Sequence, residues 1–198
     1  NSTSVLGQQL MRQRAAQHLE EVLNVAPNVN FTSGTSRARY FQIRGVGDRS
    51  QFAEPLNPSV GLLIDGIDFS GIGSVGTLFD VDQVEILRGP QGTLHGANAL
   101  AGLININSNA PSDETYHHIE AMAGDYSTYS VGLVSSGPIS DTLLYRAAVQ
   151  QFNSDGYQEN DFVGDDDTAD RDELTARGRL RWLVNPDHSI NLVLNHID

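Results

Sequence analysis

Apolar and polar residues alternate along 174–184, and this pattern constrains the fold more than any other feature of the chain. Leu183 is the one exception to it. The apolar or small residues are Leu174, Ala176, Gly178, Leu180, Trp182 and Val184, and the polar ones are Thr175, Arg177, Arg179 and Arg181. Successive side chains of a β-strand point to opposite faces, so a period of two predicts a strand with one apolar and one polar face.

Four more segments complete a set of five predicted strands. They are 117–123, 129–133, 143–150 and 190–195. Single-chain bacterial β-barrels begin at about eight strands, so five strands cannot close a barrel. We therefore expect the sequence to be a fragment of a longer protein.

The connections between these strands differ in length. Turns at 137–141 and 185–189 are short and contain Pro, Asn, Asp or Ser, whereas 153–172 is a long acidic loop. Short turns at one end and long loops at the other favour an outer-membrane barrel, and a soluble β-sandwich stays open as the alternative. The acidic loop does not follow the EF-hand calcium pattern, so we expect it to be a solvated external loop.

The part before Pro111 has a different texture. Leucines at helical spacings predict that 1–27 is helical, and short apolar runs broken by glycines over 28–111 predict a compact α+β module. The change of pattern places a boundary near 111–115. We therefore predict one domain at 1–113 and a second at 114–198.

Charge and composition exclude several classes of protein. Twelve Lys and Arg against 25 Asp and Glu give a formal net charge of −13, which argues against nucleic acid as a partner. The absence of cysteine excludes disulfides, zinc–thiolate sites and thiol catalysis. Apolar runs are too short for a transmembrane helix, and no residue constellation supports catalysis. We expect neither an enzyme nor a bound cofactor or structural metal.

Five motifs then follow one another in a fixed order. They read APNV at 26–29, FQIRG at 41–45, PSVG with IDG at 58–66, LFDVDQVEILRGPQGTLHG at 78–96 and AGLINI at 101–106. This series resembles the plug domain of TonB-dependent outer-membrane receptors, although Ala101 replaces a glycine of the last motif. The fold that this implies is an α+β plug domain followed by the first antiparallel strands of a transmembrane β-barrel, truncated before the barrel closes.

The resemblance implies energised uptake of a scarce nutrient, most often a ferric siderophore, across the outer membrane of a Gram-negative bacterium. The implied partners are TonB with ExbB and ExbD, a metal-chelate ligand and outer-membrane lipid. TonB would act through a TonB box, which we do not find in residues 1–10 and expect upstream. A passive or structural plugged barrel and a soluble periplasmic ligand-binding module stay open as alternatives.

The plug motifs predict residues with structural roles. These are Arg44, Gly45, Asp65, Gly66, Glu85, Arg88, Gly89, Pro90, Gly92, Gly96 and Gly102. Glycines and proline suit sharp backbone turns, while a charge enclosed by a barrel wall needs a partner. In the family that the chain resembles, arginines at the positions of Arg44 and Arg88 associate with carboxylates of the wall, which would lie beyond Asp198. Ordinary solvated surface charges are the alternative.

Ligand contact is expected at the apical loops of the plug, which by position are 33–39 and 48–57. The candidates are Arg37, Arg39, Arg49, Gln51 and Phe52. Cationic and aromatic groups suit an anionic chelate. The arginines at 177, 179 and 181 would face the lumen, either pairing with plug acids such as Asp65, Asp80 or Asp82 or lining a solvated wall.

Overall fold

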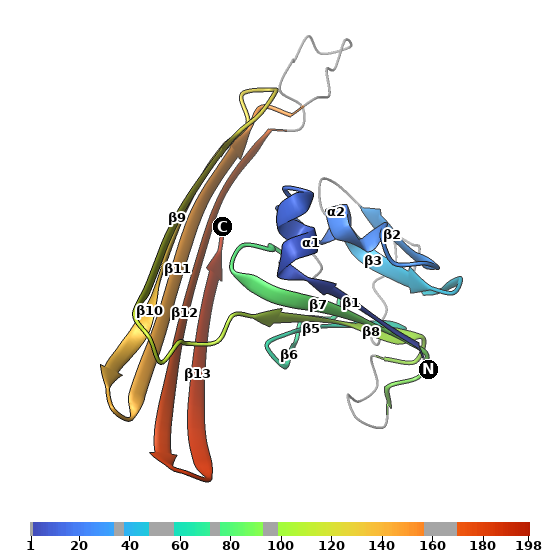
Figure 1. Cartoon of the computed structure of the whole chain (residues 1–198). Helices are drawn as coiled ribbons and strands as arrows, with labels where there is room; N and C mark the ends of the chain where they lie inside the picture. The colour runs from blue at the N-terminus through green and yellow to red at the C-terminus, as the bar shows by residue number, and fades with distance from the viewer. Residues whose placement is uncertain (1, 34–37, 48–57, 72–75, 93–98, 157–169) are drawn as a thin grey trace. The chain divides into compact units, whose positions relative to one another are not determined.

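The computed structural model describes residues 2–33, 38–47, 58–71, 76–92, 99–156 and 170–198 (Figure 1). The chain divides into two compact units, Asn1–Asn109 and Ala110–Asp198. This division falls a few residues before the boundary predicted at 113. Each unit is described by itself below.

The first unit is built on a five-stranded sheet with the order β1-β7-β8-β5-β6. Its strands are β1 (Ser2–Gly7), β5 (Val60–Ile64), β6 (Ile67–Asp68), β7 (Val81–Arg88) and β8 (Gly102–Ser108). Strands β5 and β8 are parallel, and all other neighbours are antiparallel. A smaller sheet joins β2 (Val29–Ser33), β3 (Ala38–Ile43) and β4 (Val46–Gly47) in that order.

The main core of this unit lies on one face of the five-stranded sheet, and a smaller buried cluster of Leu63, Ala99 and Leu103 is separate from it. Figure 1 shows that α1 (Gln8–Gln13), α2 (Leu19–Leu23) and the small sheet lie on the same side. The buried residues from the strands include Val84, Ile86, Ile104, Ile106 and Leu62, and those from the helices include Met11, Leu19, Val22 and Leu23. The opposite face of β7 and β8 carries the polar side chains Gln83, Glu85, Asn105 and Asn107, which are only partly buried. The apolar runs predicted as strands in 28–111 therefore form β3, β5, β7 and β8.

The prediction of one helical segment over 1–27 is wrong in part. Residues Ser2–Gly7 form β1, which pairs antiparallel with β7, and the β-branched Thr3 and Val5 suit this extended conformation. Ala15 has a positive φ of 50° between the two short helices, so they do not join. The leucine spacing nevertheless marked core positions, since Leu6, Leu19 and Leu23 are all buried.

The second unit is a five-stranded antiparallel sheet with the order β13-β12-β11-β10-β9. Its strands are β9 (Tyr116–Ala123), β10 (Tyr129–Ser140), β11 (Leu143–Ser154), β12 (Arg171–Asn185) and β13 (His188–Ile197). All five predicted strands are confirmed. The turn predicted at 137–141 is shorter than expected, because β10 continues through Gly137 to Ser140.

One face of this second sheet is apolar and exposed, as the alternation predicted. Its exposed residues include Val131, Leu133, Leu180, Trp182, Ile190, Leu192 and Leu194. Register places these residues side by side: Leu180 lies opposite Leu192, and Trp182 lies opposite Ile190. The other face carries Arg146 directly opposite Arg179.

Candidate functional site

Two of the plug motifs form the same kind of turn. Arg44 and Gly45 connect β3 to β4 with φ angles of 55° and 79°, and Asp65 and Gly66 connect β5 to β6 with 50° and 81°. Two consecutive residues with positive φ between paired strands are typical of a type I′ hairpin turn. Glycine at the second position adopts this conformation without steric cost, which is consistent with the structural role predicted for Gly45 and Gly66.

Acidic side chains fix the last residues of the first unit. The carboxylate of Asp65 accepts hydrogen bonds from the backbone N–H of Ser108 at 2.9 Å and from its hydroxyl at 2.8 Å. Asp80 accepts one from the Nδ2 of Asn109 at 2.9 Å. Both aspartates therefore hold the segment where the first unit ends. Pairing of plug acids with the arginines of β12 stays a prediction.

Arg88 is a buried cation with neutral hydrogen-bond partners. Its Nη1 donates to the carbonyl oxygen of Pro27 at 3.0 Å, and its Nη2 donates to the hydroxyl of Ser4 at 2.9 Å. Its relative exposure is 8%, and its Nε has no hydrogen-bond partner among the described residues. Arg44 is exposed and donates from Nη2 to the hydroxyl of Ser2 at 3.0 Å. Both motif arginines thus contact β1.

Glu85 belongs to a polar ladder on the opposite face of the sheet. Its carboxylate accepts hydrogen bonds from the Nε2 of Gln83 at 2.8 Å and from the Nδ2 of Asn105 at 2.9 Å. Asn105 Nδ2 also donates to the Oδ1 of Asn107 at 3.2 Å. These contacts pair Glu85 with amide donors, so its partly buried carboxylate is hydrogen-bonded within the plug.

The remaining glycines of the long motif differ in what they require. Gly89 has a φ of 120°, a conformation that L side chains rarely adopt. A Cβ on Gly102 would lie 2.5 Å from both the carbonyl oxygen of Leu87 and the Cδ1 of Ile43, so close packing requires glycine there. The turn role predicted for Gly92 stays a prediction: its φ lies outside the left-handed region, and among the described residues nothing lies within 4 Å of an added Cβ. Pro90 is exposed, and Gly96 lies outside the described residues.

Most of the predicted ligand contacts cannot be placed. Arg37, Arg49, Gln51 and Phe52 lie outside the described residues, as does the centre of the acidic loop. The backbone of Arg39 belongs to β3. The ligand-binding role of these five residues therefore stays a prediction. In the described ranges, no group of three His, Asp or Glu side chains could hold a metal ion.

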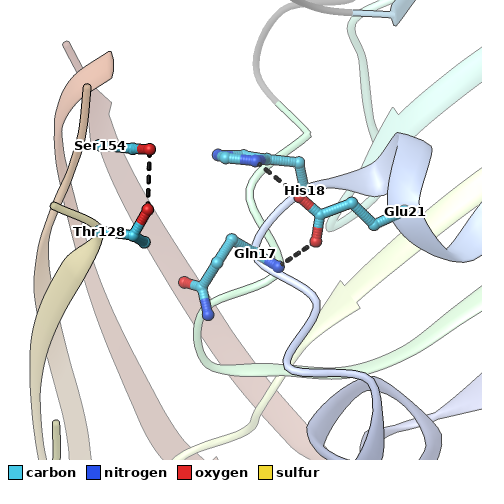
Figure 2. Close-up of polar contacts among 5 residues, drawn as sticks. All are labelled: Gln17, His18, Glu21, Thr128 and Ser154. Atoms are coloured by element: carbon cyan, nitrogen blue, oxygen red, sulfur yellow. Dashed lines mark hydrogen bonds and ion pairs between the residues drawn. The ribbon is translucent and has the colours of Figure 1, made fainter. Parts of the chain in front are cut away.

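A contact between the buried His18 and the exposed Glu21 at the start of α2 was not predicted. His18 caps this helix at 1% exposure, and its Nδ1 lies 3.2 Å from the Oε1 of Glu21, as Figure 2 shows. The backbone N–H of Gln17 donates to the Oε2 of Glu21 at 2.8 Å. Burial raises the pKa of Glu21, but hydrogen bonds from His18 and Gln17 and the charge of His18 outweigh it, so this pKa lies below its ordinary value. An acidic residue three positions after the cap was the available signal.

Two polar contacts of the second unit lie on the face that carries Arg146. Arg177 is buried and donates from Nε to the Oδ1 of Asn195 at 2.9 Å. At the end that carries the long loop, the hydroxyls of Thr128 and Ser154 are hydrogen-bonded at 2.8 Å (Figure 2). Trp182 is half exposed and lies near the short turn before β13.

Comparison with known proteins decides the family. The profile of the TonB-dependent Receptor Plug Domain matches residues 1–103, which is more than half of the chain. The chain belongs to this family. The plug profile thus covers the first four motifs and ends within the fifth, in β8.

Relatives of this plug family extend the match into the second unit. The pesticin receptor of Yersinia pestis is 33% identical over 171 residues, which cover 85% of this chain and 24% of that receptor. The vitamin B12 transporter BtuB of Vibrio vulnificus is 24% identical over 178 residues, which cover 86% of this chain and 28% of that transporter. The chain thus spans about a quarter of the length of these relatives.

Solved structures of TonB-dependent receptors agree with both units. The crystal structure of the ferric yersiniabactin uptake receptor FyuA from Yersinia pestis matches with a TM-score of 0.85 and 27% identity, covering 99% of this chain and 31% of that one. The pyoverdine outer membrane receptor FpvA from Pseudomonas aeruginosa matches with a TM-score of 0.80 and 20% identity over 99% of this chain and 27% of that one, which shows the fold alone. The fold class predicted from the sequence is therefore confirmed. In the described part of the chain, none of the helices has the length and apolar character needed to cross a membrane.

Proposed function

We propose that this chain is the N-terminal part of a TonB-dependent receptor that imports a scarce nutrient across the outer membrane of a Gram-negative bacterium. The observation that carries the proposal is a plug domain followed in the same chain by a two-faced sheet whose apolar side is exposed. An outward apolar band with polar residues on the other face is typical of strands that line a membrane barrel. The lipid of the outer membrane would contact this apolar face.

The proposed ligand is a metal chelate, with a ferric siderophore as its most specific form. Two of the relatives are named for chelates of this class, the ferric yersiniabactin uptake receptor FyuA and the ferric enterobactin receptor PirA. The match to a vitamin B12 transporter shows that the wider family accepts other bulky ligands. Arg37, Arg39, Arg49, Gln51 and Phe52 are the proposed contacts, because arginines bind anionic oxygen ligands well.

The energy for transport would come from TonB with ExbB and ExbD, acting through a TonB box upstream of Asn1. The surroundings of Arg88 support the proposal of a plug that a barrel wall encloses but does not fix in place. Its charge is buried, and none of its contacts among the described residues is a carboxylate. A buried cation without a counter-ion is costly, so a wall carboxylate beyond Asp198 would stabilise it. Arg44 is exposed in this chain and would take a similar partner.

Uptake by intact cells tests the proposal. A strain lacking the complete gene is compared with its parent and with a strain lacking TonB, using ⁵⁵Fe-labelled yersiniabactin and pyoverdine and radiolabelled vitamin B12. The proposal expects uptake of a ferric chelate to fall to background in both mutants, and vitamin B12 uptake to be unchanged in the strain that lacks only the gene. Uptake that needs the gene but persists without TonB would instead favour a passive barrel. Equal uptake of all three compounds by the deletion strain and its parent would contradict a receptor for these chelates.

Variants of the proposed ligand contacts refine this test. Arg37, Arg39 and Arg49 are replaced together by alanine in the complete receptor, and Asp82→Ala serves as the matched control because Asp82 is an exposed charge outside the proposed site. We expect the triple variant to bind its chelate at least tenfold more weakly, since each charge-assisted contact contributes roughly 1.5–3 kcal/mol. Unchanged affinity of the triple variant would remove these arginines from the ligand site.

A further inference from the structure

The first strand of the chain is held in the plug differently from the other strands. It lies at one end of the five-stranded sheet, so among the described residues only one of its edges is paired, with β7. Thr3 and Val5 are exposed on one face of β1, and Leu6 is the one buried hydrophobic residue of the strand. By contrast, β7 and β8 contribute the fully buried side chains Val84, Ile86, Ile104 and Ile106. Apolar burial therefore anchors β1 at its C-terminal end only.

The opposite end of β1 is attached by two arginines. Ser2 and Ser4 lie on the same face of the strand as Leu6, and their hydroxyls accept hydrogen bonds from Arg44 and Arg88. Ser2 is also the register partner of Arg88 in the β1–β7 pair. The arginines come from different parts of the plug, the β3–β4 turn and the end of β7. They hold one strand through two neighbouring hydroxyls.

We propose that β1 is a releasable clasp that detaches from β7 as a unit, beginning at Ser2, while β7 and β8 remain paired. The hydroxyls of Ser2 and Ser4 are the contacts that keep it closed. Hydrogen bonds to a charged donor contribute more than neutral ones, and both of these contacts have an arginine as the donor. Opening stops at Leu6, because this side chain is in the core and α1 follows directly with the buried Met11.

Opening of the clasp changes the surroundings of Arg88. The guanidinium would lose Ser4 and keep only the carbonyl oxygen of Pro27, while its Nε already lacks a partner among the described residues. Two N–H groups of a buried cation would then be free for a new acceptor, which is costly unless one arrives. The clasp therefore links the position of the N-terminal segment to the partner of Arg88, and Arg88 acts as a positioning residue. This link rests on the proposed function, in which force on that segment drives transport.

Hydrogen exchange of the complete receptor, purified in detergent without ligand or TonB, tests the clasp. Mass spectrometry follows the amides of β1 and those of β7 and β8 in the native protein, in Ser2→Ala and in Ser4→Ala. Thr3→Ala is the matched control, because Thr3 lies on the same strand and faces away from the arginines. We expect each serine variant to speed exchange of β1 about tenfold, to leave β7 and β8 unchanged, and to exceed Thr3→Ala clearly.

A cross-link provides the second measurement. Thr3 and Leu87 are register partners, so Thr3→Cys with Leu87→Cys can join β1 to β7. Val131→Cys with Gln151→Cys, register partners in β10 and β11, is the control cross-link. The oxidised β1–β7 link should slow exchange of β1 to the rate of β7 and remove the effect of Ser4→Ala, and the control link should do neither.

Two results would overturn the clasp: exchange of β1, β7 and β8 at one common rate, or a Ser4→Ala variant that behaves like Thr3→Ala. These readouts need neither ligand nor TonB. A receptor that imports none of the chelates would therefore refute the proposed function and leave the exchange result standing.

Discussion

The contact between Asp65 and Ser108 connects the β5–β6 turn to the end of β8. The carboxylate of Asp65 accepts hydrogen bonds from the backbone N–H and the hydroxyl of Ser108, at 2.9 and 2.8 Å. Asp65 is also the first residue of the β5–β6 turn, with a φ of 50°. The motif residue therefore shapes a hairpin turn and ties it to the last residue of β8.

This dual role predicts a graded effect of substitution. Asp65→Ala removes the acceptor and places alanine at positive φ, and we expect it to lower the local free energy of unfolding by about 2–4 kcal/mol. Asp65→Asn keeps an acceptor oxygen and tolerates positive φ, so about 1 kcal/mol is expected. Hydrogen exchange at the Ser108 amide measures both. Equal protection in the two variants would contradict both roles, because alanine lacks the acceptor and is strained in the turn, whereas asparagine keeps the acceptor and suits the turn.

Replacement by alanine should destabilise the plug at Gly102 but not at Gly92. A Cβ at Gly102 would meet the carbonyl oxygen of Leu87 at 2.5 Å, whereas one at Gly92 would meet none of the described residues within 4 Å. We expect Gly102→Ala to destabilise the plug by about 1–3 kcal/mol or more, because backbone atoms must shift. Gly92→Ala, the matched control, should be neutral within about 0.5 kcal/mol. Thermal unfolding followed on the β7 and β8 amides distinguishes them, and a neutral Gly102→Ala would contradict the packing described.

The contact between His18 and Glu21 predicts a dependence on pH. Because the pKa of Glu21 is lowered in the folded plug, the carboxylate stabilises the fold above the ordinary value of 4.5, and this contribution is lost as pH falls through the lowered pKa. Glu21→Gln should therefore be less stable than the native protein at pH 7 and equal to it in acid. Protection of the α2 amides across this range is the measurement. A difference that stays constant with pH would show that the charge is irrelevant.

The exposed apolar face of the second unit predicts where a charge is not tolerated. Leu192 lies opposite Leu180 on this face and is half exposed. If lipid covers the face, Leu192→Arg should cost up to about 2–4 kcal/mol, depending on its depth in the bilayer. Leu192→Met keeps an apolar side chain and is the control. The fraction of receptor that assembles in the outer membrane reports the effect, and normal assembly of the arginine variant would mean that water covers this face.

The sequence predicted the second unit well because its information is local. Alternation over 174–184 assigns each side chain to a face, and the register confirms this, with Leu180 beside Leu192 and Arg179 beside Arg146. Plug strands were also recognisable as short apolar runs. In this unit the two-residue alternation predicted both the strands and the face on which each side chain lies.

The N-terminal segment shows what local patterns cannot resolve. Leu6 fits a helical spacing with Leu10, yet it belongs to a strand because β7 offers an edge about 80 residues away in sequence. The contacts of Arg88 with Ser4 and Pro27 could not be predicted from local patterns either, because these residues are also far from Arg88 in sequence. Glycines of one motif also looked alike in sequence, although packing requires Gly102 and leaves Gly92 free. Long-range pairing decided each of these positions.

The mass and location of the native protein test the central claim most directly. Cells of the source organism are fractionated and probed with an antibody raised against this chain. We predict a heat-modifiable band in the outer membrane that is several times heavier than the 21.5 kDa of this sequence. A soluble band at 21.5 kDa would contradict the account, since a chain of that size cannot enclose its plug in a barrel.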